Sequence, residues 1–305
     1  MTTSREATGP STFARLGRKA AGAIASSRLL RGGKQLFEKN RSDINLPLSK
    51  WEKLQSGGWL ILRDVADGRF PPTFTDQTQA HAAEVNFGHA LPGFAFDAFL
   101  DAEMRKPHWG SEAFGSYSRK FERLLRLIER VTTKEHASLL ELGCGSGWMA
   151  EFLAIEGYDV VGTSISPDEI AQANRRSEAV RIKGLETRLT FRVSTMETVD
   201  ELFGDDERFD LVYVFEALHH AYDWRASLRS ALACLKPGGW LIAKEPNELH
   251  TLIAYRGAKL ANTHEVGMSK RELLSELRSA GATEVRVIRP RLNDRVSRHW
   301  LMARK

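Results

Sequence analysis

The segment from Leu139 to Ala154, LLELGCGSGWMAEFLA, constrains the fold of this chain more than any other. An apolar run leads to an acid, Glu141, and glycines follow at alternate positions, Gly143, Gly145 and Gly147. This order predicts a buried strand, a tight turn and then a helix, with side chains missing where something must lie against the backbone. The spacing G-x-G-x-G differs from the G-x-G-x-x-G fingerprint of dinucleotide-binding turns, so the turn does not need to seat a pyrophosphate.

Beyond this turn, short apolar runs alternate with helical patterns, which predicts a doubly wound, mostly parallel sheet. A helix with one apolar face, which includes Phe121 and Ile128, precedes the first strand. Capping patterns predict helix starts at Ser166 and Ser269. The predicted strands are 138–142, 159–163, 189–193, 210–215 and 240–244, and the predicted helices between them are 147–156, 167–181 and 223–235. Two last strands, Glu284–Arg289 and Arg298–Met302, are joined by Pro290–Asp294.

The first 115 residues lack this regularity. Residues 1–40 contain eight lysines and arginines but two glutamates, so they carry a charge of +6 and leave −1 for the rest of the chain. Their glycines and serines predict that part of this segment is disordered. Residues 41–115 show no clean period and become aromatic after Asn86. We expect an irregular cap there, packed over a catalytic domain of residues 116–305.

The charge distribution indicates which partners the protein can bind, and the cysteine content indicates its cellular compartment. The nearly neutral main body argues against nucleic-acid binding. The basic segment is interpreted as a solvated tail, as an arm for peripheral contact with an acidic membrane, or as a cleaved targeting peptide. No apolar run approaches the roughly 18 residues that a membrane span needs. The two cysteines, Cys144 and Cys234, form no disulfide or zinc pattern, so we expect a cytoplasmic protein.

Four segments together resemble class I methyltransferases that depend on S-adenosylmethionine (SAM). They are the glycine turn, Tyr158–Gly162, Phe209–His220 and the LKPGG turn within Leu235–Ile242. The last two strands are similar to the family's reversed final hairpin. The resemblance extends from Ser116 to the C-terminus and implies a seven-stranded, mostly parallel sheet with a C-terminal antiparallel hairpin strand.

The resemblance also implies where the cofactor binds. Glu141 matches the acid that the family uses near the methionine part of SAM, and Gly143 and Gly145 would let the backbone approach it. Cys144 fits a small residue in the turn better than a catalytic thiol. Tyr117 or Trp109 could stack on the cofactor, although core packing explains such aromatic residues as well. The predicted cofactor-binding residues are Tyr117, Glu141, Gly143, Cys144, Gly145, Ser164, Ile165, Met196, Glu197 and Glu216.

The chain departs from the family pattern at two positions. Ser164 stands at the end of the second strand, where an acid usually binds the ribose hydroxyls. After the third strand, Thr195 replaces the usual acid near the adenine, and Glu197 could compensate from two positions on. A serine hydroxyl can still hydrogen-bond a ribose, but it lacks the charge of a carboxylate.

Candidate catalytic groups follow the fourth strand, at the edge where open α/β sheets bind ligands. A hydroxyl or amine acceptor must lose a proton, which requires a base in reach. His220, with His219 as second candidate, could be this base, and Glu216 could line the transfer pocket. The alternative is that one imidazole packs and the other orients a loop. We predict no metal site, because His219, His220, Glu245 and His250 lack the i, i+4 spacing of a helical site.

The predicted function is SAM-dependent methylation of an oxygen, nitrogen or carbon atom. The expected acceptor is a small metabolite or a glycan or lipid precursor. Two alternatives stay open at this point. Ser164 and Thr195 leave room for a non-catalytic SAM-binding or scaffolding protein, and a related nucleotide-binding fold would allow an NAD(P)-dependent oxidoreductase.

Overall fold

The computed structural model describes residues 28–43, 46–70, 74, 76–93, 95–108, 110–133, 137–182, 188–204, 206–289 and 298–305. Three features discussed above lie outside these residues: the first 27 positions of the basic segment, Trp109, and the predicted hairpin turn Pro290–Asp294. Among the described residues, no helix combines the length and the apolar character that crossing a bilayer requires.

Seven strands of the described chain form one sheet in the order β3-β2-β1-β4-β5-β7-β6. Strands β1 to β5 are parallel, whereas β7 runs antiparallel between β5 and β6. This confirms the predicted sheet with its reversed final hairpin strand. The strands are β1 (Ser138–Leu142), β2 (Asp159–Ser164), β3 (Leu189–Val193), β4 (Phe209–Phe215), β5 (Leu235–Pro246), β6 (Glu284–Val287) and β7 (Arg298–Arg304).

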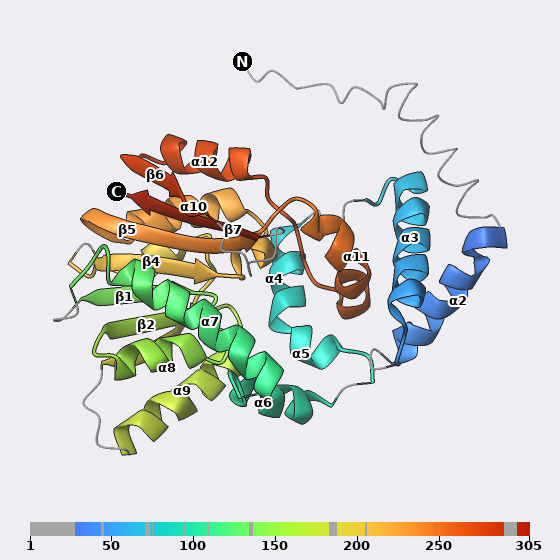
Figure 1. Cartoon of the computed structure of the whole chain (residues 1–305), viewed down its shortest axis with the longest axis horizontal. Coiled ribbons are helices and arrows are strands. Elements are labelled where there is room, and N and C mark those ends of the chain that lie inside the picture. The colour runs from blue at the N-terminus through green and yellow to red at the C-terminus, as the bar shows by residue number, and fades with distance from the viewer. Residues whose placement is uncertain are drawn as a thin grey trace.

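Helices cover both faces of this sheet (Figure 1). Alternate residues of β1 explain the two layers, because Leu139 packs in one hydrophobic cluster and Leu140 in the other. The first layer contains α7 (Ser111–Ile128), α8 (Trp148–Ile155) and α9 (Pro167–Ile182), and the second contains α10 (Trp224–Ala233) and α12 (Lys270–Ser279). The 3-10 turns η1 (Val199–Leu202) and η2 (Leu218–His220) follow β3 and β4.

Both predicted caps are present. The Ser269 hydroxyl accepts a hydrogen bond from the Glu272 backbone N–H at 3.2 Å and donates one to the Glu272 carboxylate at 2.7 Å. The Ser166 hydroxyl accepts from the Glu169 backbone N–H at 3.4 Å. Each cap satisfies a helix N–H that has no partner within the helix.

The segment 41–115, expected to be irregular, is largely helical. Helix α2 lies within the end of the basic segment and extends just beyond it. The prediction failed because some of these helices are short and others pack against residues far away in the sequence. The apolar residues of the segment therefore show little helical periodicity. The elements are α2 (Arg28–Ser42), α3 (Lys50–Ala66), α4 (Gln77–Val85), α5 (Phe87–Ala90) and α6 (Phe96–Met104).

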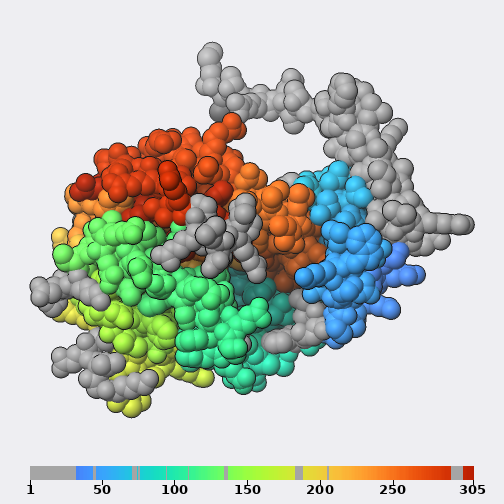
Figure 2. Space-filling view, in the orientation of Figure 1, coloured from blue at the N-terminus to red at the C-terminus, as the bar shows by residue number. Residues whose placement is uncertain are grey.

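The N-terminal helices form two groups (Figure 1). Helices α4, α5 and α6 lie beside the end toward which the parallel strands point, while α2 and α3 lie farther out with α11 (His250–Ala261). Helices α2, α3 and α11 share a small hydrophobic core of their own. Its buried residues are Phe37, Trp59, Leu60, Tyr255 and Leu260. Together they form one side of the molecular surface (Figure 2).

Candidate active site

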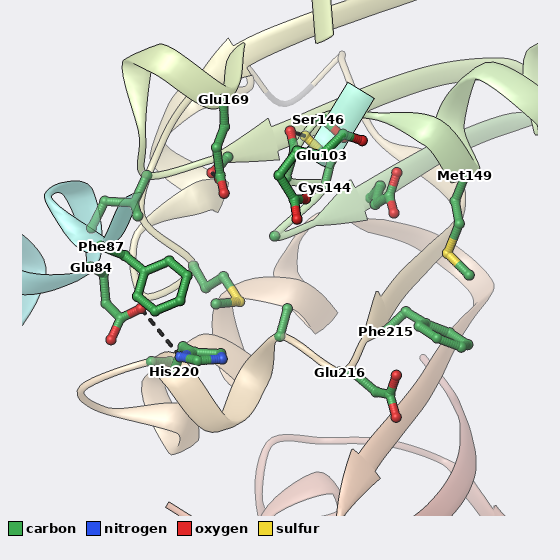
Figure 3. Close-up of a pocket in the computed structure, with 18 of the residues that line it drawn as sticks. Glu84, Phe87, Glu103, Cys144, Ser146, Met149, Glu169, Phe215, Glu216 and His220 are labelled. Atoms are coloured by element: carbon green, nitrogen blue, oxygen red, sulfur yellow. Dashed lines mark hydrogen bonds and ion pairs between the residues drawn. The ribbon is translucent and has the colours of Figure 1, made fainter. Parts of the chain in front are cut away.

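A cavity of about 400 Å³ opens at the carboxyl end of the parallel strands, between the sheet and helices α4 to α7. This volume lies within the range of roughly 300–1,000 Å³ that ligand pockets occupy. The ten residues predicted to bind the cofactor all line the cavity, and so does His220 (Figure 3). His219 is not among the lining residues.

The glycine turn leaves its tip bare toward this cavity. A side chain at Gly143 would place its Cβ 2.4 Å from the Cβ of Ala217, so packing excludes any larger residue there. At Gly145 the nearest atom to an added Cβ is a Glu169 carboxylate oxygen at 3.9 Å. Gly145 has φ +53°, a conformation that favours glycine. A ligand can therefore approach the backbone at Gly145 without obstruction by the protein's own side chains.

Glu141 lies almost fully buried at the end of β1. Burial raises the pKa of its carboxyl to about 8. Among the described residues, none forms a hydrogen bond with the Oε2 atom. A buried carboxylate oxygen without a partner is costly, and a cationic or hydrogen-bond-donating group of a ligand would satisfy it.

Ser164 does not stand alone in the place of the usual acid. Its hydroxyl donates a hydrogen bond of 2.5 Å to Oε2 of Glu169, in the first turn of α9. Glu169 also lines the cavity, and burial raises the pKa of its carboxyl. The sequence pattern showed Glu169 only as a capping acid. Its role in the site could have been inferred, because a residue in the first turn of a helix can face the end of the preceding strand.

Thr195 and Glu197 both line the cavity at the end of β3. The Thr195 hydroxyl lies 2.9 Å from the hydroxyl of Thr198. Oε1 of Glu197 accepts a hydrogen bond from the backbone N–H of Asp223 at 3.2 Å and lies 3.3 Å from Nε2 of His81 on α4. Glu197 thus supplies a carboxylate near the position where Thr195 lacks one, and it also joins the sheet to the cap.

Glu216 stands among cations. Its carboxylate oxygens lie 2.5 Å from the Lys244 ammonium, 2.7 Å from Nε of Arg298 and 3.0 Å from the Lys120 ammonium. Burial acts to raise the pKa of Glu216, but these three charges outweigh it and hold the pKa well below its usual range. Glu216 is therefore ionised at neutral pH and is a poor proton acceptor. Its catalytic role stays a prediction. At the cavity, its carboxylate holds the side chains of Lys244, Arg298 and Lys120 in place.

His220 faces the cavity as half of a dyad with Glu84 from α4 (Figure 3). Nδ1 of His220 lies 3.2 Å from a Glu84 carboxylate oxygen. Burial acts to lower the pKa of His220, but the charge of Glu84 raises it to about 9. In the free protein His220 is therefore a cation at neutral pH. Glu84 escaped prediction because it belongs to the N-terminal segment, where no motif marked it.

His219 and Cys144 have buried, unreactive environments. Burial lowers the pKa of His219 well below its usual value, and Nδ1 lies 2.8 Å from Oε2 of Glu245. This environment suits a packed imidazole, whereas the alternative that the second imidazole orients a loop stays a prediction. Burial also raises the pKa of the Cys144 thiol well above its usual value, so the thiol stays neutral.

The cap reaches the cavity mainly through α4 to α6. Glu103 and Lys106, at the end of α6, line it together with Phe87 and Phe99. Tyr117 of α7 lines it as well, and its ring packs edge-on against Trp148 with centroids 5.4 Å apart. The cavity is therefore closed on one side by the sheet and on the other by aromatic and charged residues of the cap.

Comparison with known proteins shows the family to which this chain belongs. Residues 96–287 match a family model described as a methyltransferase domain. The chain is 33% identical over 163 residues to a ubiquinone biosynthesis O-methyltransferase of Methylobacterium nodulans, a match that covers 50% of this chain and 61% of the relative. It is 25% identical over 185 residues to the enzyme of that name from Hydrogenovibrio crunogenus, covering 57% of this chain and 74% of the relative.

A third relative is a probable S-adenosylmethionine-dependent methyltransferase of Mycobacterium tuberculosis. It is 29% identical over 178 residues, which cover 57% of this chain and 59% of the relative. Among solved structures, magnesium protoporphyrin IX methyltransferase from Synechocystis with bound SAH has a TM-score of 0.54. That alignment covers 75% of this chain and all of the other, at 14% identity, so it concerns the fold alone.

Proposed function

The chain belongs to the class I family of SAM-dependent methyltransferases, and we propose that it transfers the methyl group of SAM to a hydroxyl oxygen of a small acceptor. The observation that carries this proposal is the cavity, which the bare backbone of Gly145 lines together with the buried Glu141 and the half-buried Glu169. The names of the relatives from Methylobacterium and Hydrogenovibrio favour oxygen as the acceptor atom.

The residues present fit two polar parts of the cofactor, its ammonium group and its ribose. The unpartnered oxygen of Glu141 would accept a hydrogen bond from the ammonium group of SAM. The Ser164–Glu169 pair would bind the ribose hydroxyls, since a carboxylate and a hydroxyl together offer both acceptors and a donor. Glu169 thus restores the charged ribose contact whose loss Ser164 had suggested.

When bound, SAM supplies an electrophilic methyl group on a sulfonium, so the protein contributes mainly alignment and exclusion of water. The acceptor oxygen would attack the methyl carbon as the bond from that carbon to sulfur breaks, and the acceptor proton must leave. Because His220 is a cation at neutral pH in the free protein, only its neutral form, which gains population as the pH rises toward about 9, would take this proton on Nε2. Glu84 would stabilise the resulting imidazolium. The products are a methyl ether, S-adenosylhomocysteine and a proton.

The cap residues that line the cavity indicate the chemical class of the acceptor. The cavity wall opposite the glycine turn carries Phe87 and Phe99 beside the Glu84–His220 dyad. An aromatic wall with one polar dyad suits a small hydroxylated, partly apolar molecule, such as a metabolite or a lipid precursor. A glycan precursor fits less well because it would leave the aromatic rings without an apolar partner.

Two expectations about the setting of this reaction stay predictions. Cys144 and Cys234 are both free and buried, which is compatible with the expected cytoplasmic location. Peripheral membrane contact through the basic segment 1–40 is the other prediction, and the first 27 residues of that segment lie outside the described chain.

The proposal is tested by incubating the full chain with methyl-labelled SAM and fractionated small molecules from cell extract. We expect label to enter a hydroxylated, extractable compound, and we expect His220→Asn to slow the transfer by about 100-fold or more. His89→Asn, on the exposed surface of α5, is the matched control. Transfer to no fraction would favour the scaffold alternative, and an unchanged rate in His220→Asn would remove the assigned base.

A further inference from the structure

A cluster of titratable side chains beside the cavity takes no part in the proposed methyl transfer. His219 of η2, His250 at the start of α11, and Glu265 in the segment before α12 each offer one ligand atom, and these three atoms all lie within 4.8 Å of one another. Glu265 lines the cavity, whereas the two histidines do not. The rings of His219 and His250 meet edge-on, with centroids 4.9 Å apart.

A buried carboxylate fixes the orientation of His219. Oε2 of Glu245 lies 2.8 Å from Nδ1 of His219, and Oε1 accepts the backbone N–H groups of Ala217 and Leu218 at 3.1 and 3.0 Å. Because Glu245 engages Nδ1, Nε2 is the nitrogen left for another partner. Histidines that bind metal ions commonly donate their second ring nitrogen to a carboxylate in this way.

The charge balance of the cluster also favours a cation. Nε2 of His250 lies 3.0 Å from the Glu265 carboxylate. No ion pair among the described residues joins a lysine or an arginine to Glu265, whereas Glu216 nearby has three such partners. Two imidazoles and one carboxylate therefore converge without a paired lysine or arginine among the described residues. The cationic ring of His220, whose centroid lies 4.3 Å from that of His219, is the positive charge that a bound ion would have to tolerate.

The spacing suits an ion with modest adjustment. Bonds of about 2.1 Å to nitrogen and oxygen set neighbouring ligand atoms roughly 3–4 Å apart. The three side chains would need to draw together by about 1 Å, which rotation about their side-chain bonds can provide. Two imidazoles select a first-row transition ion over Mg²⁺ or Ca²⁺, which take mainly oxygen ligands.

Although the sequence spacing predicted no metal site, we infer that His219, His250 and Glu265, which the fold brings together, bind a divalent transition-metal ion such as Zn²⁺ or Co²⁺ at the wall of the cavity. The ligand atoms would be the Nε2 atoms of the two histidines and the carboxylate of Glu265. Glu245 supports the site by holding His219. Three protein ligands leave a coordination position for water or for a ligand in the cavity.

The test is a Co²⁺ titration of the full chain after treatment with a chelator and dialysis, without SAM or acceptor. We expect one equivalent of Co²⁺ to produce visible absorption bands, and Zn²⁺ to displace it. His250→Ala and Glu265→Gln should weaken Co²⁺ binding by at least about 10-fold, and Glu245→Gln by about 10- to 100-fold. His89→Ala, whose exposed ring pairs with Asp168 away from the cluster, should bind Co²⁺ like the wild type.

Circular dichroism of each variant separates loss of the site from loss of the fold. The inference is overturned if the folded wild type binds no Co²⁺ in near-equimolar solution, or if Glu265→Gln binds it with unchanged affinity. Since the readout needs neither SAM nor methyl transfer, the metal site and the proposed function can fail independently.

Discussion

Glu169 is the residue on which the cofactor end of the cavity depends most. It lies against the hydroxyl of Ser164 and beside the open tip of the glycine turn at Gly145. We therefore expect it to take the role of the acid that the second strand lacks. A ribose hydroxyl of the bound cofactor would then hydrogen-bond the Glu169 carboxyl group beside Ser164.

We expect Glu169→Ala to weaken SAM binding by about 10- to 100-fold, because hydrogen bonds to a charged group contribute roughly 1.5–3 kcal/mol. Glu178→Ala, on the exposed side of the same helix, should leave binding unchanged. Isothermal calorimetry with SAM measures both. Equal affinity of the two variants would show that Glu169 does not contact the cofactor.

Glu141 makes the stability of the free protein dependent on pH. Its pKa is about 8 in the fold against an ordinary value near 4.5, so folding favours the neutral form. The stability that this preference contributes is present below pH 4.5 and is lost as the pH rises toward 8, on the order of a few kcal/mol. Glu141→Gln has no such proton to lose.

The stability of Glu141→Gln relative to the wild type should therefore rise between pH 5 and pH 8.5, while its affinity for SAM falls. Urea unfolding of both proteins at the two pH values measures the first effect, with pH 5 as the internal control. A stability difference that is the same at both values would contradict the raised pKa. Unchanged SAM affinity would contradict the proposed ammonium contact.

At the scale of the secondary-structure elements, α9 contacts the cap through the side chain of Arg176. This buried guanidinium contacts Glu151 at 2.7 Å and donates to the backbone carbonyl groups of Glu103, Met104 and Lys106 at 2.9–3.3 Å. These carbonyls belong to the last turn of α6 and the two residues after it, where few helical N–H groups remain to satisfy them. One side chain thus positions the part of the cap that lines the cavity.

Arg176→Lys keeps a charge for Glu151 but cannot reach three carbonyl groups at once. We expect hydrogen exchange at the end of α6, over residues 101–108, to quicken at least several-fold, with a loss of about 1–3 kcal/mol in the free energy of unfolding. Arg181→Lys, exposed on the same helix, is the control. The assignment fails if this segment exchanges equally fast in both variants.

The sheet could be predicted from the sequence because its signals are local. Buried parallel strands such as β1 are nearly continuous apolar runs, and glycine or capping residues mark their ends. Their predicted bounds agree with the structure to within about a residue for β1 to β4. Strand β5 is longer than predicted because its pairing continues through the LKPGG segment after a register shift near Phe209.

The cap and half of the site could not be predicted in this way. The core of α2, α3 and α11 joins residues far apart in the chain, as does the 2.6 Å hydrogen bond from the Tyr255 hydroxyl to Asp64. Glu84 meets His220 across 136 positions of sequence. Contacts of this kind leave no short-range pattern, so only the folded chain shows the dyad.

At the scale of the whole molecule, the catalytic domain and helices α4 to α6 of the cap line one cavity. The catalytic domain supplies the glycine turn, Glu141 and Glu169, and the cap supplies Glu84, Phe87 and Phe99. The central claim is that the bare tip of the turn at Gly145 receives the cofactor.

That claim is tested most directly by titrating the full chain with S-adenosylhomocysteine in a calorimeter. We predict one site in the wild type and a loss of at least about 10-fold in affinity for Gly145→Ala, whose new methyl group would project into the cavity. Gly68→Ala is matched in backbone strain, since Gly68 has φ +72° and open space around it, and should bind normally. No binding to the wild type, or equal affinity in both variants, would contradict the account.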